Sequence, residues 1–266
     1  MIRLAALLAA ALVLLGACLT VGMACGGGSA LTLTLKPDPP ATPTAGDRPS
    51  LLADTAAVLR RRAELYGLAD ANADVTSDGA ISVALSGIER ETAVRLLTAR
   101  GALEFRRPSI LNNGLVACKT LDGQDFAVPK QQVNPDSASG QAARCFSADR
   151  LGTPQWLPAT VSTASGEKTL SAESVQPNGW ELREDPSPTL AVRFTDDGAL
   201  LFEQLTSALT GYDLGVFIDG ALVAAPRIQR TIKEGRAVIS GFDATTARIL
   251  AAQLNSGPLP VALSPA

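Results

Sequence analysis

The sequence predicts a mixed α+β protein that is exported from the cytoplasm, and three observations support this. Residues 31–106 have the pattern strand, helix, strand, strand, helix, strand. Residues 214–263 have the pattern hairpin, strand, helix, strand. An apolar segment from Leu4 to Ala24 follows a single basic residue, Arg3, as in export signals. Strands and helices in this mixed order are typical of α+β domains, in which helices cover one face of a sheet.

Composition excludes several classes of function. The 266 residues carry a net charge of −3, which argues against a nucleic-acid partner, because such a partner requires a basic surface. The chain contains no histidine, so catalysis and metal binding that depend on histidine are excluded. Aromatic residues make up 4% of the chain, too few to form stacking platforms for bases.

The apolar segment within residues 1–30 allows three interpretations. A lipoprotein signal is indicated by Leu15-Gly16-Ala17-Cys18, in which Cys18 would be acylated, with Cys25 as the alternative. An uncleaved membrane anchor is also compatible with the length of the apolar run. The third interpretation is a cleaved secretory signal that releases a soluble protein. All three place the remaining chain outside the cytoplasm, attached to the membrane by a lipid or by the anchor in the first two cases.

Residues 31–107 are predicted to form the first folded domain. Alternation over Leu31–Leu35 indicates a strand, and a helix is expected from Leu51 to Tyr66. Segments 71–76 and 81–85 flank a turn and form a hairpin, a helix follows over 89–100, and Ala102–Arg106 forms the last strand. This βαββαβ order predicts a ferredoxin-like base.

Residues 108–266 are predicted to form a second domain, in which 108–188 is an irregular insertion and 189–266 a regular core. Proline, glycine and polar residues are dense in the insertion, and no long periodicity is found there. It contains Cys118 and Cys145, which in an exported chain would most simply form a disulfide. Closing that loop would stabilise the fold by roughly 3–4 kcal/mol.

The regular core is predicted from turn and cap signals. Strands are expected near 180–183 and 189–194, and Thr195 or Asp197 would cap the next helix. Asp219-Gly220 predicts a two-residue type I′ hairpin turn. A strand over 236–242 follows, then a helix that Asp243 would cap and Gly257-Pro258 would end.

No catalytic, cofactor-binding or metal-binding set is found in the sequence. Asp196-Asp197 stand where carboxylates usually cap a helix or oppose its dipole. Gly26-Gly27-Gly28 lacks the context of a phosphate-binding loop. The triplet Arg60-Arg61-Arg62 is interpreted as a solvated helix face rather than a binding patch. We therefore expect a protein that is not an enzyme.

Ordered motifs in both domains resemble the SecD family of the bacterial SecDF protein-export complex, in its large periplasmic domain with base and head subdomains. In the second domain the resemblance rests on Asp219-Gly220, Ala225-Pro226, Ser240-Gly241-Phe242 and Gly257-Pro258-Leu259-Pro260. In the first it rests on Leu65-Tyr66-Gly67-Leu68, Leu85-Ser86-Gly87 and Leu103-Glu104-Phe105-Arg106. The Asp-Leu-basic-Gly-Gly motif usual at the start of the family's domain has no clear counterpart here.

The resemblance implies a function without catalysis, in which a membrane-tethered domain assists protein export. The expected partners are translocating polypeptide or components of SecDF and SecYEG. Because no membrane-spanning helices follow the domain, a stand-alone SecD-like chain is expected. A fold shared with SecD does not fix its function. The alternative is therefore a structural or regulatory lipoprotein of the cell envelope that reuses the head fold.

Overall fold

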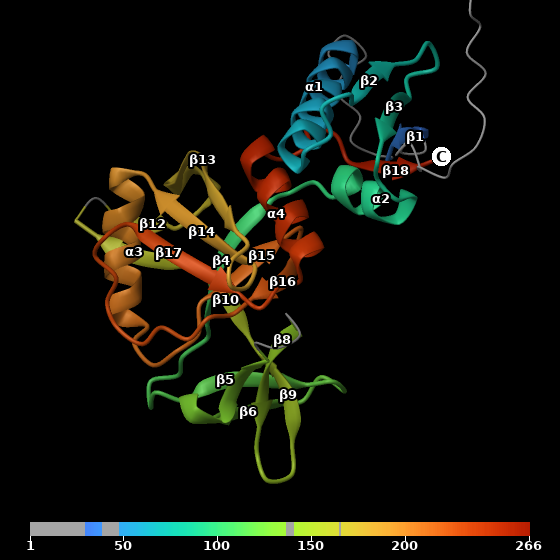
Figure 1. Ribbon diagram of the computed structural model, residues 1–266. Coiled ribbons are helices and arrows are strands. Elements are labelled where there is room, and N and C mark those ends of the chain that lie inside the picture. The colour runs from blue at the N-terminus through green and yellow to red at the C-terminus, as the bar shows by residue number, and fades with distance from the viewer. Residues whose placement is uncertain (1–29, 39–47, 137–140, 165) are drawn as a thin grey trace, which may run out of the picture.

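The computed structural model describes residues 30–38, 48–136, 141–164 and 166–266, arranged in three parts (Figure 1). The first part, called the base, is a four-stranded sheet with helices α1 and α2. The second, the head, contains two sheets and helix α3. The third, the insertion, is a small five-stranded sheet that extends from the head. Helix α4 lies between the head and the base (Figure 1). The predicted α+β class is confirmed.

The base sheet has the strand order β18-β1-β3-β2, with every neighbouring pair antiparallel. Its strands are β1 (Ala30–Pro37), β2 (Asn72–Val75), β3 (Ile81–Ser86) and β18 (Leu263–Pro265). Helix α1 (Arg48–Tyr66) connects β1 to β2, and helix α2 (Arg90–Thr98) follows β3 and leads to the head. The order is that of a ferredoxin-like sheet, but its fourth strand comes from the end of the described chain.

The prediction that Ala102–Arg106 completes the base sheet is wrong. This segment belongs to β4 (Leu103–Pro108), which pairs with two strands of the head. The side chains of Leu103 and Phe105 are buried in the head core, whereas Leu263 of β18 is buried in the base core. Alternation identifies a strand but not the sheet that it joins. The sequence of β4 and β18 therefore did not show that β18, and not β4, is the fourth strand of the base sheet. The predicted boundary at residue 107 falls within β4.

The head packs two sheets around one core. The first sheet has the order β10-β4-β15-β16 and adds β10 (Trp156–Pro158), β15 (Gly215–Ile218) and β16 (Ala221–Ala224). The second has the order β13-β14-β17, formed by β13 (Val175–Arg183), β14 (Thr189–Phe194) and β17 (Arg236–Ser240). Helices α3 (Asp196–Ala208) and α4 (Ala244–Ser256) cover this core with side chains such as Phe202 and Leu250. The hairpin β11 (Thr160–Thr163) and β12 (Gly166–Thr169) and the short helix η2 (Ala172–Ser174) lie beside α3.

Local signals in the head give the structure they predict. Asp219 and Gly220 have φ values of 52° and 77°, the left-handed pair that a type I′ turn requires. Thr195 caps α3 by accepting a hydrogen bond from the Gly198 N–H, and Asp243 caps α4 by accepting one from Thr246. Gly257, with φ 80°, ends α4.

The insertion is more regular than its composition predicts. Its sheet has the order β6-β5-β9-β8-β7, from β5 (Val116–Thr120), β6 (Asp125–Val128), β7 (Val133–Asp136), β8 (Gln141–Phe146) and β9 (Leu151–Pro154). The short helix η1 (Lys130–Gln132) precedes β7. Cys118 of β5 and Cys145 of β8 are buried and form a disulfide, as expected from the sequence. Strands this short, interrupted by glycine and proline, carry too few residues for a periodic signal.

Candidate binding groove

The described residues do not bring together a catalytic or metal-binding set. Within these ranges, no group of three or more His, Cys, Asp or Glu side chains could hold a metal ion. Cys118 and Cys145 are bonded to each other. The predicted lipidation sites, Cys18 and the alternative Cys25, lie outside the described residues. Among the helices that the structure describes, none combines the length and apolarity needed to cross a membrane.

The candidate site is a groove of about 820 Å³ in the head, beside strand β17. Apolar side chains from β4, β13, β14, β15, β17 and the segment after β16 line it, including Phe105, Trp180, Phe194, Val216, Ile228 and Ile239. Most of these belong to the head core, so the groove opens onto that core at the edge of the sheet. Concave apolar sites with a few polar groups at the rim are the usual form of binding sites.

Strand β17 contributes both of its faces to the groove. Ala237 and Ile239 point to the core face, whereas Arg236 and Val238 point to the outer face of the sheet. Val238 keeps 54% of its surface exposed, which is unusual for a large apolar side chain on a regular strand. The groove lining therefore includes side chains from both faces of β17: Ala237 and Ile239 from the core face, and Arg236 and Val238 from the outer face.

The edge of β17 that faces away from β14 has free backbone groups. The hydrogen bond from the Phe194 N–H to the Gly235 carbonyl sets the pattern of the β14–β17 ladder, which then continues through Ala237 and Ile239. The backbone groups of Arg236, Val238 and Ser240 consequently point away from β14. No described backbone or side-chain group is hydrogen-bonded to them. An open edge of this kind is a template for another strand.

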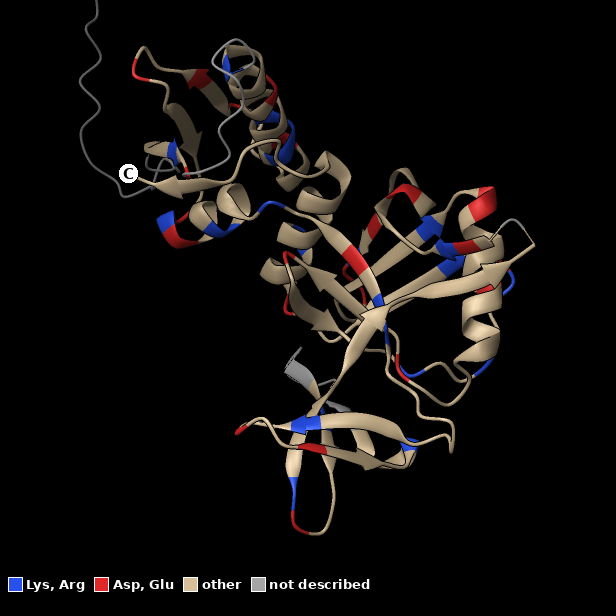
Figure 2. Cartoon of the chain, turned by 180° about the vertical axis from the view of Figure 1, so that it is seen from behind, with Lys and Arg blue, Asp and Glu red and all other residues tan. Residues whose placement is uncertain are grey.

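The outer face of the β13-β14-β17 sheet is basic. Arg183, Arg193 and Arg236 are exposed there, together with one carboxylate, Glu181. Arg183 donates to Glu181 at 3.2 Å, and this hydrogen bond lowers the pKa of Glu181, with smaller effects from the charges of Arg193 and Arg236. Figure 2 shows basic segments gathered on neighbouring strands of the head.

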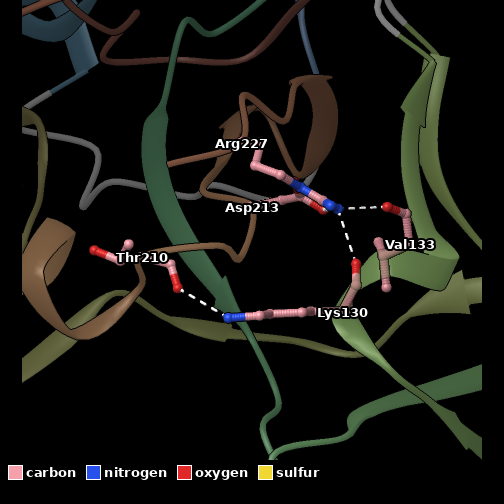
Figure 3. A network of polar contacts seen from close by, with 5 residues as sticks. All are labelled: Lys130, Val133, Thr210, Asp213 and Arg227. Carbon is pink, nitrogen blue, oxygen red and sulfur yellow. Dashed lines mark hydrogen bonds and ion pairs between the residues drawn. The ribbon is translucent and has the colours of Figure 1, made fainter. Parts of the chain in front are cut away.

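An ion pair between a buried carboxylate and a partly exposed arginine holds the loop that borders the groove. Arg227 and Asp213 contact each other at 2.9 Å, and Asp213 is only 2% exposed (Figure 3). Arg227 also donates hydrogen bonds to the carbonyls of Lys130 and Val133 in the insertion. Burial raises the pKa of Asp213, although the charge of Arg227 opposes this. The network ties the groove loop to the insertion.

A second buried network, around Arg62, joins the base to α4. The Arg62 side chain has no exposed surface, so the interpretation of Arg60-Arg61-Arg62 as a solvated face is wrong for this member. Its guanidinium donates to carbonyls at the end of α2, to the Gly257 carbonyl and to the Ser256 hydroxyl. These are the C-terminal ends of α2 and α4, where helix carbonyls lack partners and a positive charge is favourable.

Sequence reasoning did not identify the groove or Arg62. Arg193 and Arg236 stand in separate strands, and only the register of β14 and β17 makes them neighbours. The signal available was one arginine beside apolar residues in each strand, in Arg193-Phe194 and Arg236-Ala237-Val238-Ile239. This signal indicated that each strand has one exposed face, but it did not show that the exposed faces of β14 and β17 lie on the same side of one sheet.

Comparison with known proteins shows similarity to SecD and SecDF. Residues 144–261 match the family model for the SecDF P1 head subdomain. A protein translocase subunit SecD from Synechocystis is 27% identical over 260 residues, covering 91% of this chain and 52% of the relative. A protein translocase subunit SecDF from Thermus thermophilus is 26% identical, covering 77% of this chain and 26% of the relative.

Solved structures agree with the sequence matches. A structure described as "Structure and function of a membrane component SecDF that enhances protein export" aligns with a TM-score of 0.53 and 25% identity. The alignment covers 89% of this chain and 98% of that one. A SecDF crystal structure in a super-membrane-facing form aligns with a TM-score of 0.57 and 25% identity, covering 90% of this chain and 30% of that one.

The chain spans about half, or less, of the length of the first curated relatives it matches. Those relatives are translocase subunits, and the matched head model covers the β13-β14-β17 sheet, α4 and the groove lining apart from Phe105. The match also extends through the base, since the Synechocystis alignment covers 91% of the chain. This chain is therefore similar to the SecD and SecDF translocase subunits over most of its length, and residues 144–261 match the SecDF P1 head subdomain.

Proposed function

We propose that this domain assists protein translocation by binding extended polypeptide along the free edge of β17. The single observation that carries the proposal is the unpaired row of backbone groups at Arg236, Val238 and Ser240, beside an apolar groove. An incoming strand would pair its own backbone with this row, and its side chains would reach the groove. Pairing through main-chain hydrogen bonds suits a translocation factor, because such hydrogen bonds form with polypeptides of many different sequences.

The groove offers further binding energy without requiring a particular sequence. Apolar side chains of an added strand would leave water on contact with Trp180, Ile228 or Ile239, each of which lines the groove. The role is one of binding and includes no chemical step. Sec components are the proposed alternative occupants, and a lipid at Cys18 or an N-terminal anchor is the proposed attachment to the outer face of the membrane.

Peptide binding can be measured through Trp180, since the chain contains two tryptophans and Trp156→Phe leaves Trp180 as the sole reporter. A peptide of about eight residues, the length of a long strand, should change its fluorescence on binding. Val238→Pro removes an outward N–H without removing a ladder donor of β17, so binding should weaken about tenfold or more.

Val238→Ala is the matched control, because it shortens the side chain but keeps the edge N–H. It should bind within a few fold of the parent protein. Equal binding by the proline and alanine variants, with both still folded by circular dichroism, would show that the β17 edge is not the binding element. The same edge can be tested in cells by placing a photo-crosslinking residue at position 238 and probing for exported chains.

A further inference from the structure

Two arginines face each other on the outer surface of the head sheet. Arg193 of β14 and Arg236 of β17 are direct cross-strand partners. Since the ladder bonds pass through Ala237 and Gly235, this is a non-hydrogen-bonded pair, in which opposing side chains come closest. Like charges directly opposite each other destabilise a sheet. The pairing of Arg193 with Arg236 therefore lowers the stability of the sheet, which suggests that the two arginines serve binding rather than folding.

The described residues provide little compensation for these charges. Neither Arg193 nor Arg236 forms an ion pair with any residue that the structure describes. Glu181, the carboxylate on the neighbouring strand, is held by Arg183 at 3.2 Å. The face thus has three arginines and one glutamate, although the chain as a whole has a net charge of −3. The positive charge of this face that is not compensated by an ion pair lies directly beside the free edge of β17.

Resting on the proposed strand addition, we propose that the groove selects extended segments in which acidic side chains alternate with apolar ones. Successive side chains of a strand point to opposite faces of its sheet. A strand added to β17 would therefore place one set of side chains beside Arg236 on the outer face, where Arg193 stands next to it. The other set would lie beside Ala237 and Ile239, on the face that opens to the apolar groove.

The free edge favours a polypeptide over an anionic lipid as the occupant. A lipid headgroup would be attracted to Arg193 and Arg236 but has no backbone to pair with Val238. An acidic peptide satisfies both features at once, by charge on one face and hydrogen bonds along the edge. The two features share one strand, so they would act on the same ligand.

The test compares blocked octapeptides that alternate valine with aspartate, with serine or with lysine, using Trp180 fluorescence of Trp156→Phe protein. The aspartate peptide should bind about tenfold more tightly than the lysine peptide at low salt, and the difference should shrink at high salt. The serine peptide should fall between them. In the variant Arg193→Glu/Arg236→Glu, the order of the aspartate and lysine peptides should reverse.

A matched control is Arg90→Glu/Arg150→Glu, which makes the same change in net charge at exposed positions in the base and the insertion. It should keep the preference for the aspartate peptide. If it loses the preference to the same degree as Arg193→Glu/Arg236→Glu, the selectivity reflects overall charge and the inference fails.

The remaining outcomes separate this inference from the proposed function. Equal binding of the aspartate and lysine peptides, still weakened by Val238→Pro, would overturn the acidic preference and leave strand addition standing. Absence of binding by every peptide would overturn both. Vesicles rich in phosphatidylglycerol provide the last arm. If they bind in a manner lost in Arg193→Glu/Arg236→Glu but unaffected by Val238→Pro, and no peptide is preferred, the arginines form a lipid site and the inference is wrong.

Discussion

The guanidinium Nη2 of Arg62 donates a hydrogen bond of 3.1 Å to the carbonyl of Gly257, a residue 195 positions further along the chain. The same nitrogen donates to the Arg100 carbonyl at 3.2 Å. One side chain of α1 thereby satisfies the C-terminal ends of two other helices. Burial lowers the pKa of Arg62 to about 10, so its charge is kept at neutral pH. This charged group joins the base to α4 together with apolar contacts of Ile249 and Ala252 in the base core.

Arg62→Met should destabilise the protein by about 3–5 kcal/mol, because it leaves several buried carbonyls without donors. Arg62→Lys should recover part of this loss, since lysine keeps the charge but not the planar fork. Urea unfolding at neutral pH measures both. Arg60→Met, on the exposed face of the same helix, is the control and should cost no more than about 0.5 kcal/mol. Similar losses at positions 60 and 62 would contradict the role given to Arg62.

Asp219 forms a second connection, between the head hairpin and the segment that links α2 to β4. Its carboxylate accepts hydrogen bonds from the N–H groups of Gly101 at 3.2 Å and Ala102 at 2.9 Å. Asp219→Ala should cost about 2–4 kcal/mol, since it removes both acceptors and puts alanine in a left-handed conformation. Asp219→Asn tolerates that conformation and keeps one acceptor, so thermal unfolding should show a smaller loss. Equal losses for the two variants would contradict this account, because asparagine keeps one acceptor and tolerates the left-handed conformation.

The features predictable from sequence are those fixed by neighbouring residues. The Asp219-Gly220 turn and the caps at Thr195 and Asp243 follow from local backbone chemistry, and each forms as expected. The positions of β4 and β18 do not follow in this way. Both segments have the composition of short strands, and their sheets are decided by which core buries Phe105 and Leu263.

The candidate site depends on the non-local part of the fold. Arg60, Arg61 and Arg62 are indistinguishable as a triplet, and only the meeting of α1, α2 and α4 buries the third. The groove likewise needs the register of β14 against β17, which pairs Arg193 with Arg236. Sequence patterns indicated the resemblance to SecD and most of the helices and strands. They did not give the surface on which function is proposed.

Attachment at Cys18 is a prediction about the residues before the described fold. If Cys18 is acylated after cleavage, the intact mass of membrane-extracted protein should correspond to a chain that begins at Cys18 and carries lipid. Cys18→Ser should then shift the protein from the membrane to the soluble fraction, whereas Cys25→Ser should not. A mass that includes residues 1–17 would favour an uncleaved anchor instead.

Arg227→Met should destabilise the head in a pH-dependent manner. It leaves Asp213 buried without its cation, at a cost of about 3–5 kcal/mol near neutral pH. The folded-state pKa of Asp213 is already raised by burial, and losing Arg227 raises it further. A raised pKa means that the folded state binds the proton more tightly than the unfolded state. This contribution is full below the ordinary value of 3.8 and is lost as pH rises through the folded pKa.

Urea unfolding of Arg227→Met at about pH 4.5 and pH 7 should therefore show the larger loss, relative to the parent protein, at pH 7. Arg230→Met is the control, because Arg230 is an exposed neighbour in the same loop and has no ion pair within the described residues. It should change little at either pH. A loss for Arg227→Met that is the same at both values would show that Asp213 does not titrate in this range.

Removing the disulfide should unfold the insertion before the head. The buried core of the insertion is small, with Val116, Val128, Val133 and Ala143 around the two cysteines. Cys118→Ala/Cys145→Ala should lose about 3–4 kcal/mol, because the unfolded loop gains freedom. Hydrogen exchange should then show lost protection in β5–β9, while β14 and the ladder-bonded amides of Ala237 and Ile239 in β17 remain protected. If β14 and β17 lose protection to the same extent, the insertion and the head unfold as one unit, and the disulfide stabilises the groove itself.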